Sequence, residues 1–248
     1  MEMEMEMSST EDIEIATDIT PPLTPLSFSL HNTHLHTHCS SCFSLITPPP
    51  IPNPINYCSP HCSTSHSSIP LSSAEHHLPS SSTSSLLRTA LRLLLLHHHS
   101  HGSTRFNHLL TNRHLLTSQN DDVAETVRLG ARAMATAIEK QNGCSNDGAI
   151  LEEATVALCA VLTNAVEVHD NEGCALGIAV FEHAFSWINH SCSPNACYRF
   201  SFSNSSYLLS RESKLRIAPF TQNSQQPQVI FFLSTFVQFL LLLFSNMM

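Results

Sequence analysis

The sequence predicts an α+β protein in which small β-sheets lie on either side of a helical middle. Three observations lead to this prediction. Apolar residues recur at helical spacing between residues 85 and 170, whereas residues 195–220 alternate between apolar and polar side chains. Two pairs of cysteines come before the helical stretch and indicate a small metal-binding insert.

The composition limits the classes of function. The chain has 248 residues, of which 12% are charged, and a net charge of −9. An acidic chain has no electrostatic affinity for nucleic acid or an anionic membrane surface, so no direct nucleic-acid partner is expected. Its 9 cysteines come without a secretory signal, because the opening MEMEMEM has neither a basic nor an apolar region. We therefore expect reduced thiols or metal ligands, in the nucleus or the cytoplasm.

The first third of the chain contains little that would fold unaided. Residues 1–10 are expected to be disordered, and residues 11–30 to form a short strand near Ile13–Ile19 followed by extended chain. Residues 31–84 are rich in His, Ser, Pro and Cys and lack apolar periodicity, so a hydrophobic core cannot order them. The histidine tract at 31–38 is interpreted as a spacer, with metal binding as the alternative.

Four cysteines can order this segment. Cys39-x-x-Cys42 is followed after 15 residues by Cys58-x-x-x-Cys62. Two cysteine pairs on short turns are typical of a tetrahedral zinc site, in which each thiolate lies about 2.3 Å from the ion. Coincidence in a cysteine-rich, unstructured stretch is the alternative, but it leaves the segment without any source of order. The spacing predicts one zinc ion bound by these four residues.

Two helices are predicted directly after this insert. Residues 86–99 are leucine-rich, with Ser85 as the N-cap. Residues 120–143 run from a capping Asn120 to a Gly143 placed where a helix usually ends. The predicted apolar face of this second helix is Val123, Val127, Ala131, Met134 and Ile138.

A third helix and then strands complete the predicted order. The third helix is placed at 149–170, with Cys159 in its core. Its predicted buried face is Leu151, Ala154, Leu158, Val161, Leu162 and Ala165. Beyond Gly173 the pattern favours strands, and residues 195–220 are expected to form two strands around a turn rich in Ser and Asn.

The last residues have a different character. Residues 229–244 are almost entirely apolar, and no charged residue follows Arg216. This run is shorter than the about 18–20 residues that a spanning helix needs and has no flanking Lys or Arg, so a membrane partner is not expected. We interpret residues from about 221–229 onward as the product of a retained intron or a mis-assigned gene structure, because non-coding pyrimidine-rich message yields such residues.

The most specific signal is the heptapeptide NHSCSPN at residues 189–195, which follows the apolar run AFSWIN. It resembles the signature of SET-domain protein methyltransferases, and KLRIAPF (214–220) is similar to the strand that follows it in that family. Tyr57-Cys58-Ser-Pro-His-Cys62 resembles the third ligand pair of a MYND zinc finger. Together these motifs are similar to plant SET-domain-group proteins of the SMYD-like branch, in which a MYND finger interrupts the SET domain.

The resemblance implies a domain organisation and a metal site. It implies SET-type small β-sheets interrupted by a zinc-knuckle insert and by a helical insertion, and incomplete at the C-terminus. In MYND fingers the first and third ligand pairs share one zinc ion, which would be held here by Cys39, Cys42, Cys58 and Cys62. The implied segments are 1–10 (disordered), 11–30 (N-terminal SET-like strand), 31–84 (MYND-like insert and Ser/His/Pro-rich linker), 85–170 (helical insertion), 171–220 (C-terminal SET core) and 221–248 (apolar tail outside the family).

The resemblance also implies a cofactor and a reaction. In the family, the Asn-His of the signature contacts S-adenosylmethionine, which assigns cofactor binding to Asn189 and His190. The implied reaction is methyl transfer to a lysine amine of a protein substrate, histone or non-histone. Its catalysis depends mainly on aligning the amine with the sulfonium.

The chain departs from the family at two places. Its first 101 residues contain no glycine, whereas the family has a Gly-x-Gly segment there, and no tyrosine follows KLRIAPF. We therefore expect weak or lost S-adenosylmethionine binding, assign no catalytic residue, and expect this chain to be inactive as a methyltransferase. The alternative function is a zinc-dependent protein-interaction module, that is, a SET pseudoenzyme.

Overall fold

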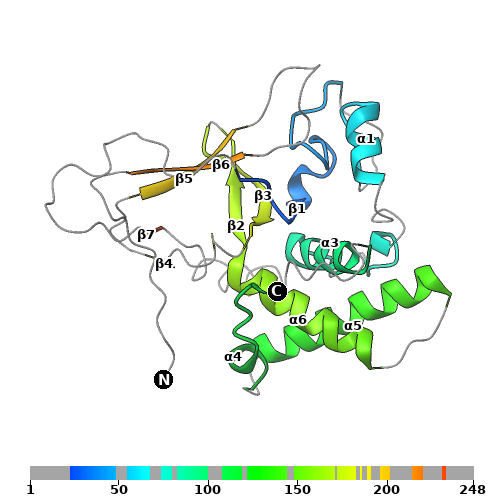
Figure 1. Ribbon diagram of the computed structural model, residues 1–248. Helices are drawn as coiled ribbons and strands as arrows, with labels where there is room; N and C mark the ends of the chain where they lie inside the picture. The colour runs from blue at the N-terminus through cyan, green and yellow to red at the C-terminus, as the bar shows by residue number, and fades with distance from the viewer. Residues whose placement is uncertain are drawn as a thin grey trace, which may run out of the picture.

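The computed structural model combines helices with small, mainly antiparallel sheets, which agrees with the predicted α+β class (Figure 1). It describes residues 23–48, 55–67, 74–79, 83–99, 108–118, 122–143, 148–170, 172–182, 185, 189–190, 196–201, 214–219 and 231–232. Within these ranges, no helix has both the length and the apolar character that crossing a bilayer requires. The predicted strand at Ile13–Ile19 lies outside the described residues.

The elements follow one another in a simple order. A short strand and a cysteine-bearing segment come first, then four helices, then strands. In chain order they are β1 (Ser27–Leu30), η1 (Asn32–His34), α1 (Pro60–Ser67), α3 (Ser85–His99), α4 (Arg113–Ser118), α5 (Asp122–Asn142), α6 (Ala149–Asn164), β2 (Val166–His169), β3 (Ala175–Val180), β4 (Asn189–His190), β5 (Ala196–Ser201), β6 (Lys214–Pro219) and β7 (Phe231–Phe232). In Figure 1, helices α3 to α6 lie together on one side of the sheet formed by β1, β2 and β3.

The central sheet is antiparallel, in the order β1–β3–β2. Leu30 pairs with Gly177, and a Cβ atom at position 177 would lie 2.2 Å from the carbonyl oxygen of Ser29. Only glycine permits this close approach of β1 to β3.

Strand β3 separates two hydrophobic cores. Ile178 and Val180 pack with the apolar faces of α3, α5 and α6, whereas Ala179 and Phe181 belong to a smaller core on the opposite side of the sheet. That alternation is expected, because successive side chains of a strand point to opposite faces. Phe43, from the cysteine-bearing segment, is part of the smaller core. The sheet is therefore the layer between the helices and the candidate metal site.

Helix α3 agrees with the prediction for residues 86–99, except at its N-cap. The Leu87 N–H donates to the hydroxyl of Ser84 (3.3 Å), one residue before the predicted cap. Ser85 was expected to cap the helix, but its hydroxyl lies instead 3.0 Å from Nδ1 of His31. The Ser85 side chain, which the local sequence favours as the cap, is therefore engaged by a residue from a distant part of the chain.

Helix α5 agrees with the second predicted helix. Gly143 follows its last residue with φ +66°, and the Gly143 N–H donates to the Glu139 carbonyl (2.9 Å). This is the role for which a C-terminal glycine is suited. Val127, Ala131, Met134 and Ile138 are buried as predicted, and Val123 is only partly buried.

The third predicted helix is too long, because helix α6 ends at Asn164 and not at residue 170. The Ala165 N–H still donates to the Val161 carbonyl, but Ala165 itself has extended backbone angles. The next residues, Val166–His169, form strand β2, whose side chains alternate between buried and half-buried positions. β-branched residues at alternate positions favour a strand over one more helical turn.

The predicted buried face of α6 also needs a correction. Leu151 was expected to be buried, but it is exposed near the N-terminus of the helix. Ala154, Leu158 and Val161 are buried as predicted, and Cys159 lies in the core.

The late strands agree with the sequence pattern. Strands β5 and β6 are antiparallel, with Ala196 opposite Pro219 and Ser201 opposite Lys214. The two-residue strand β4 pairs in parallel with β7.

Candidate metal centre

The first cysteine pair lies on a tight turn. The Cys39 N–H donates to the Ser44 carbonyl, and the Phe43 N–H donates back to the Cys39 carbonyl, both at 2.9 Å. Phe43 has φ +61°, in the left-handed region, and its side chain is buried in the smaller core. Because a non-glycine residue rarely adopts this conformation, we attribute it to the burial of the Phe43 ring and the hydrogen bonds that close the turn.

The second cysteine pair lies at the start of helix α1. The hydroxyl of Ser59 accepts the Cys62 N–H (3.2 Å), as an N-terminal capping side chain does. Cys58 lies two residues before the helix and Cys62 lies in its first turn, and their sulfur atoms are 3.6 Å apart. The Ser40 N–H donates to the Asn56 carbonyl (2.8 Å), which joins the two cysteine-bearing turns.

The four sulfur atoms converge. Sγ of Cys42 lies 3.5 Å from Sγ of Cys58, which lies 3.6 Å from Sγ of Cys62, and all four sulfurs, including that of Cys39, are within 4.8 Å of one another. Four thiolates at about 2.3 Å from a tetrahedral zinc ion would be about 3.8 Å apart, whereas a disulfide bond is about 2.0 Å long. All four cysteines are free thiols. The sulfur positions therefore fit a tetrahedral ion such as zinc.

The electrostatics of the thiols also favour a cation. A hydrogen bond from the Cys39 thiol lowers the pKa of Cys42 to about 4 and raises the pKa of Cys39. Burial raises the pKa of Cys58 to about 11. Without a cation, Cys42 is therefore readily ionised, whereas Cys39 and Cys58 resist ionisation. A bound divalent ion would stabilise all four thiolates together.

Aromatic packing joins the cysteine-bearing segment to the sheet. The ring of Phe43 meets that of Phe28, from β1, edge to face at 5.5 Å. Phe28 in turn packs against the smaller core. The first cysteine turn is therefore supported by β1, 11 residues before Cys39 in the chain.

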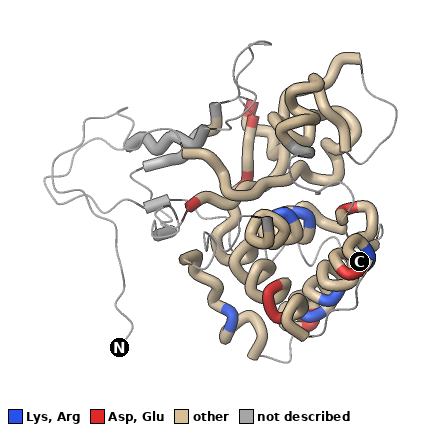
Figure 2. The backbone as a smooth tube through the Cα atoms, turned by 45° about the vertical axis from the view of Figure 1, so that its right-hand side comes forward, with Lys and Arg blue, Asp and Glu red and all other residues tan. Residues whose placement is uncertain are grey.

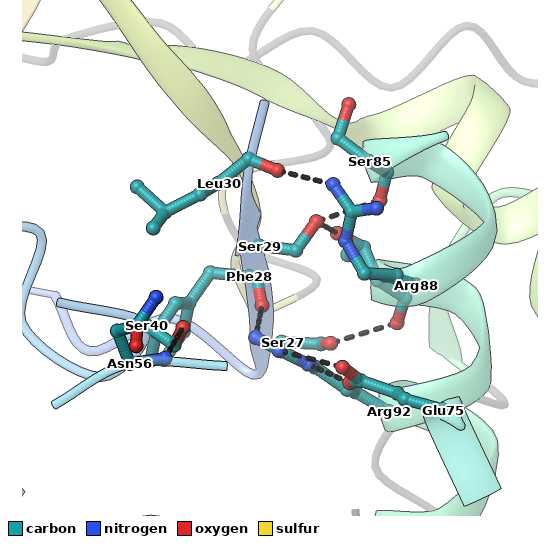
Figure 3. A network of polar contacts seen from close by, with 11 residues as sticks. Ser27, Phe28, Ser29, Leu30, Ser40, Asn56, Glu75, Ser85, Arg88 and Arg92 are labelled. Carbon is teal, nitrogen blue, oxygen red and sulfur yellow. Dashed lines mark hydrogen bonds and ion pairs between the residues drawn. The ribbon is translucent and has the colours of Figure 1, made fainter. Parts of the chain in front are cut away.

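Two buried arginines of α3 fix the free edge of β1 (Figure 3). The backbone N–H of His31 donates to the Leu176 carbonyl of β3. Because backbone groups alternate in direction along an antiparallel strand, the carbonyls of Phe28 and Leu30 point away from β3. Nη1 of Arg92 donates to the Phe28 carbonyl (2.7 Å), and Nη2 of Arg88 donates to the Leu30 carbonyl (2.6 Å). The edge carbonyls of β1 are therefore satisfied by side chains rather than by another strand.

Glu75 completes this arrangement. Its carboxylate accepts hydrogen bonds from Nε and Nη2 of Arg92, and both side chains are about 5% exposed. The segment that follows the metal centre is thereby joined to α3. In the tube view, basic (blue) and acidic (red) positions both occur along the helices (Figure 2). The role of these two arginines was not predicted from the sequence. An i, i+4 pair of arginines within a buried helix face was the available signal.

The predicted cofactor residues are only partly described. Asn189 and His190 form β4, where their backbones pair with Phe231 and Phe232 of β7. Their side chains, and residues 191–195, lie outside the described part of the structure. Their predicted contact with S-adenosylmethionine therefore stays a prediction.

Comparison with known proteins gives a close match. No family model matches the chain. A curated relative, Protein SET DOMAIN GROUP 41 of Arabidopsis thaliana, is 47% identical over 207 residues, which are 82% of this chain and 35% of the relative. The chain therefore spans about a third of the length of the curated relative that it matches.

Proposed function

Because the chain belongs to the SET-domain-group family of plant proteins, we propose that it is part of a SET-domain protein-lysine methyltransferase that uses S-adenosylmethionine. The observation that carries this proposal is the 47% identity to a SET DOMAIN GROUP protein, together with the NHSCSPN signature at residues 189–195. The implied acceptor is a lysine amine on a protein, histone or non-histone.

Cofactor binding is assigned to the start of the signature. Asn189 offers amide donors and an acceptor, which suit the edge of an aminopurine ring, and His190 adds an imidazole next to it.

The metal centre has a different role in this proposal. Four thiolates leave no open coordination position, and such closed zinc sites are structural rather than catalytic. Zinc would therefore order the segment from Cys39 to Cys62 and take no part in methyl transfer.

Calorimetry with S-adenosylmethionine tests the cofactor assignment. We expect weak binding to this 248-residue chain that is lost on Asn189→Ala. Asn204→Ala, in the Ser/Asn-rich stretch of sequence after the signature, is the matched control and should leave binding unchanged. Binding that is tight and survives Asn189→Ala would remove the assignment to the signature.

Transfer of a labelled methyl group to protein substrates tests the activity. We propose that this polypeptide alone transfers no methyl group, because no tyrosine follows residue 207 in it and the amine would lack an aligned hydroxyl. Labelled product from the chain alone would contradict that expectation and support an active methyltransferase.

A second candidate function is a zinc-dependent protein-interaction module. It is favoured by the closed geometry of the four cysteines, which is typical of modules that bind partners through a metal-ordered surface. Zinc-dependent capture of a protein partner, without S-adenosylmethionine binding, would favour this function over the first.

A further inference from the structure

The four cysteines of the metal centre differ in their access to solvent. Cys39 and Cys62 are fully buried, whereas Cys42 is half-buried and Cys58 is exposed. The thiolate is the form of cysteine that binds a metal, and it is also the form that reacts with oxidants, most readily where it is accessible. An oxidant in solution therefore meets the sulfur of Cys58 before the others.

Two sulfur atoms are close enough to Cys58 to react with it next. Sγ of Cys58 lies 3.5 Å from Sγ of Cys42 and 3.6 Å from Sγ of Cys62. Cys62 is buried in helix α1, and its N–H donates to the Ser59 hydroxyl, so its backbone is fixed. Cys42 lies on a turn and is partly accessible. Because a disulfide requires the two sulfurs to approach to about 2.0 Å, Cys42 is the partner that can move.

Hydrogen bonds between the two cysteine-bearing turns hold Cys42 and Cys58 opposite each other. The Ser40 N–H donates to the Asn56 carbonyl (2.8 Å), and the Asn56 N–H donates back to the Ser40 hydroxyl (3.3 Å) (Figure 3). The side-chain amide of Asn56 also donates to the Leu35 carbonyl (2.8 Å). Ser40 precedes Cys42 by two residues, and Asn56 precedes Cys58 by two residues. The contact that joins the turns therefore places the two cysteines at matching positions.

We propose that Cys42 and Cys58 form a site of reversible oxidation, at which a peroxide converts two metal-binding thiolates into a disulfide. The Cys58 thiolate attacks one oxygen of hydrogen peroxide and breaks the O–O bond, which gives a sulfenic acid and a hydroxide. The Cys42 thiolate then attacks the oxidised sulfur, forms the S–S bond and displaces a second hydroxide. The two sulfurs lose two electrons in total, and the two hydroxides take two protons from solvent and become water.

The disulfide would replace the metal as the link between the two turns. Its sulfurs are no longer thiolates, so Cys39 and Cys62 alone remain as ligands, whereas a closed zinc site needs four. A bound zinc ion would therefore be released. The new bond spans 16 positions of the chain and restricts the unfolded form of that loop. The inference concerns the metal centre and does not depend on the proposed methyltransferase function.

Treatment of the zinc-loaded full chain with hydrogen peroxide tests the proposal. We expect release of about one zinc ion per chain, measured with a chromogenic chelator, together with a Cys42–Cys58 linkage found by mass spectrometry of unreduced peptides. A dithiol reductant followed by Zn²⁺ should restore both thiols and the bound ion. A linkage from Cys58 to Cys62, or zinc that stays bound after Cys42 and Cys58 are oxidised, would overturn the proposal.

An exposed cysteine outside the metal centre provides the matched control. Cys174 is exposed, and its Sγ lies 4.0 Å from Nε2 of His34 and apart from the four converging sulfurs. Cys174→Ser should release zinc under peroxide as fast as the unmodified chain does. Slower release from this variant would show that peroxide acts first at Cys174, and the assignment to Cys58 would be wrong.

Hydrogen exchange gives a second measurement that does not rely on metal analysis. The amides of residues 38–62 should be better protected in the oxidised, zinc-free chain than in the reduced chain treated with a chelator, because the disulfide limits local opening. Equal exchange in the two samples would show that oxidation does not link the turns.

Discussion

The helical core and the cysteine-bearing segment are ordered by different forces. Helices α3, α5 and α6 share one continuous core whose side chains are nearly all apolar, among them Leu91, Met134 and Val161. Apart from its cysteines, the segment from residue 38 to residue 62 buries only two large apolar side chains among the described residues, Phe43 and Ile55. The comparison teaches that the helices can fold by removing apolar surface from water, whereas the cysteine segment depends on what its four thiols bind.

Of the changes considered, removing the metal should have the largest effect, and it should separate the behaviour of the two regions. We expect Cys39→Ser, or a strong chelator, to abolish zinc binding and to make the amides of residues 38–62 exchange rapidly, while α3, α5 and α6 stay protected. Structural zinc contributes about 10–16 kcal/mol to small metal-dependent folds, more than this segment can replace with two buried side chains. Hydrogen exchange with parallel metal analysis measures both effects.

A matched control uses a cysteine of the helical core. Cys159 is fully buried in α6, so Cys159→Ala should leave the zinc content unchanged. If zinc persists in Cys39→Ser, the four cysteines are not the ligands. If the helices lose protection together with the cysteine segment, the two regions fold as one unit and the comparison fails.

The buried ion pair between Arg92 and Glu75 holds residues 74–79, which follow the cysteine segment, against α3, so breaking it should have the next largest effect. Glu75→Gln leaves the buried guanidinium of Arg92 without its charged partner, and losing one partner of a buried pair typically costs about 3–5 kcal/mol. Denaturant unfolding monitored by circular dichroism measures the loss. Glu125→Gln is the control, because its pair with Arg128 is about half exposed and should contribute at most about 1 kcal/mol. Equal effects of the two substitutions would show that the buried pair is not a structural link.

The sequence predicts the helices well because their signals are local. Apolar periodicity together with a terminal glycine predicted the position of α5 almost correctly. The cysteine spacing predicted that Cys39, Cys42, Cys58 and Cys62 lie together, and their sulfur atoms converge in the structure. Each of these signals lies within one short stretch of chain, where 3.6-residue periodicity or ligand spacing is visible directly.

The contacts that join distant stretches could not be predicted in this way. Arg92 meets Phe28 across 64 positions, and no local pattern shows that a charged residue of a helix will complete a strand edge. The contact of Glu167 with His31 was not predicted, because residues 149–170 were interpreted as one helix, although Val166–His169 alternate as a strand does. Only the fold brings Glu167 opposite His31.

Leu91→Ala tests the helical side of the comparison. Leu91 is fully buried in α3, and such a truncation typically costs about 2–5 kcal/mol through lost burial and the cavity left behind. We expect the unfolding midpoint to fall by a corresponding amount, while zinc content stays the same. Leu45→Ala, at an exposed position beside the first cysteine turn, is the control and should change stability little. A loss of zinc in Leu91→Ala would mean that the cysteine segment depends on the helical core.

Gly130→Ala should have the smallest effect, and its sign tests how tightly the helical core is packed. Glycine inside a helix costs about 0.5–1 kcal/mol relative to alanine, so the substitution gains backbone stability. The new Cβ would lie 2.8 Å from Cδ2 of Leu158 and 3.4 Å from Cδ1 of Leu87, so the Leu158 side chain must shift within the core. These terms oppose each other, and we expect the unfolding free energy to change by less than about 1 kcal/mol.

Gly177→Ala provides the contrast for that result, because there the obstacle is the Ser29 carbonyl oxygen at 2.2 Å, which belongs to backbone and cannot rotate away. That substitution should separate β1 from β3 and destabilise the protein much more than Gly130→Ala does. A loss at Gly130 as large as the loss at Gly177 would mean that the side chains between α5 and α6 are as immobile as the backbone of the sheet. In that case the helical core, like the cysteine segment, would be held in one specific arrangement rather than by apolar burial alone.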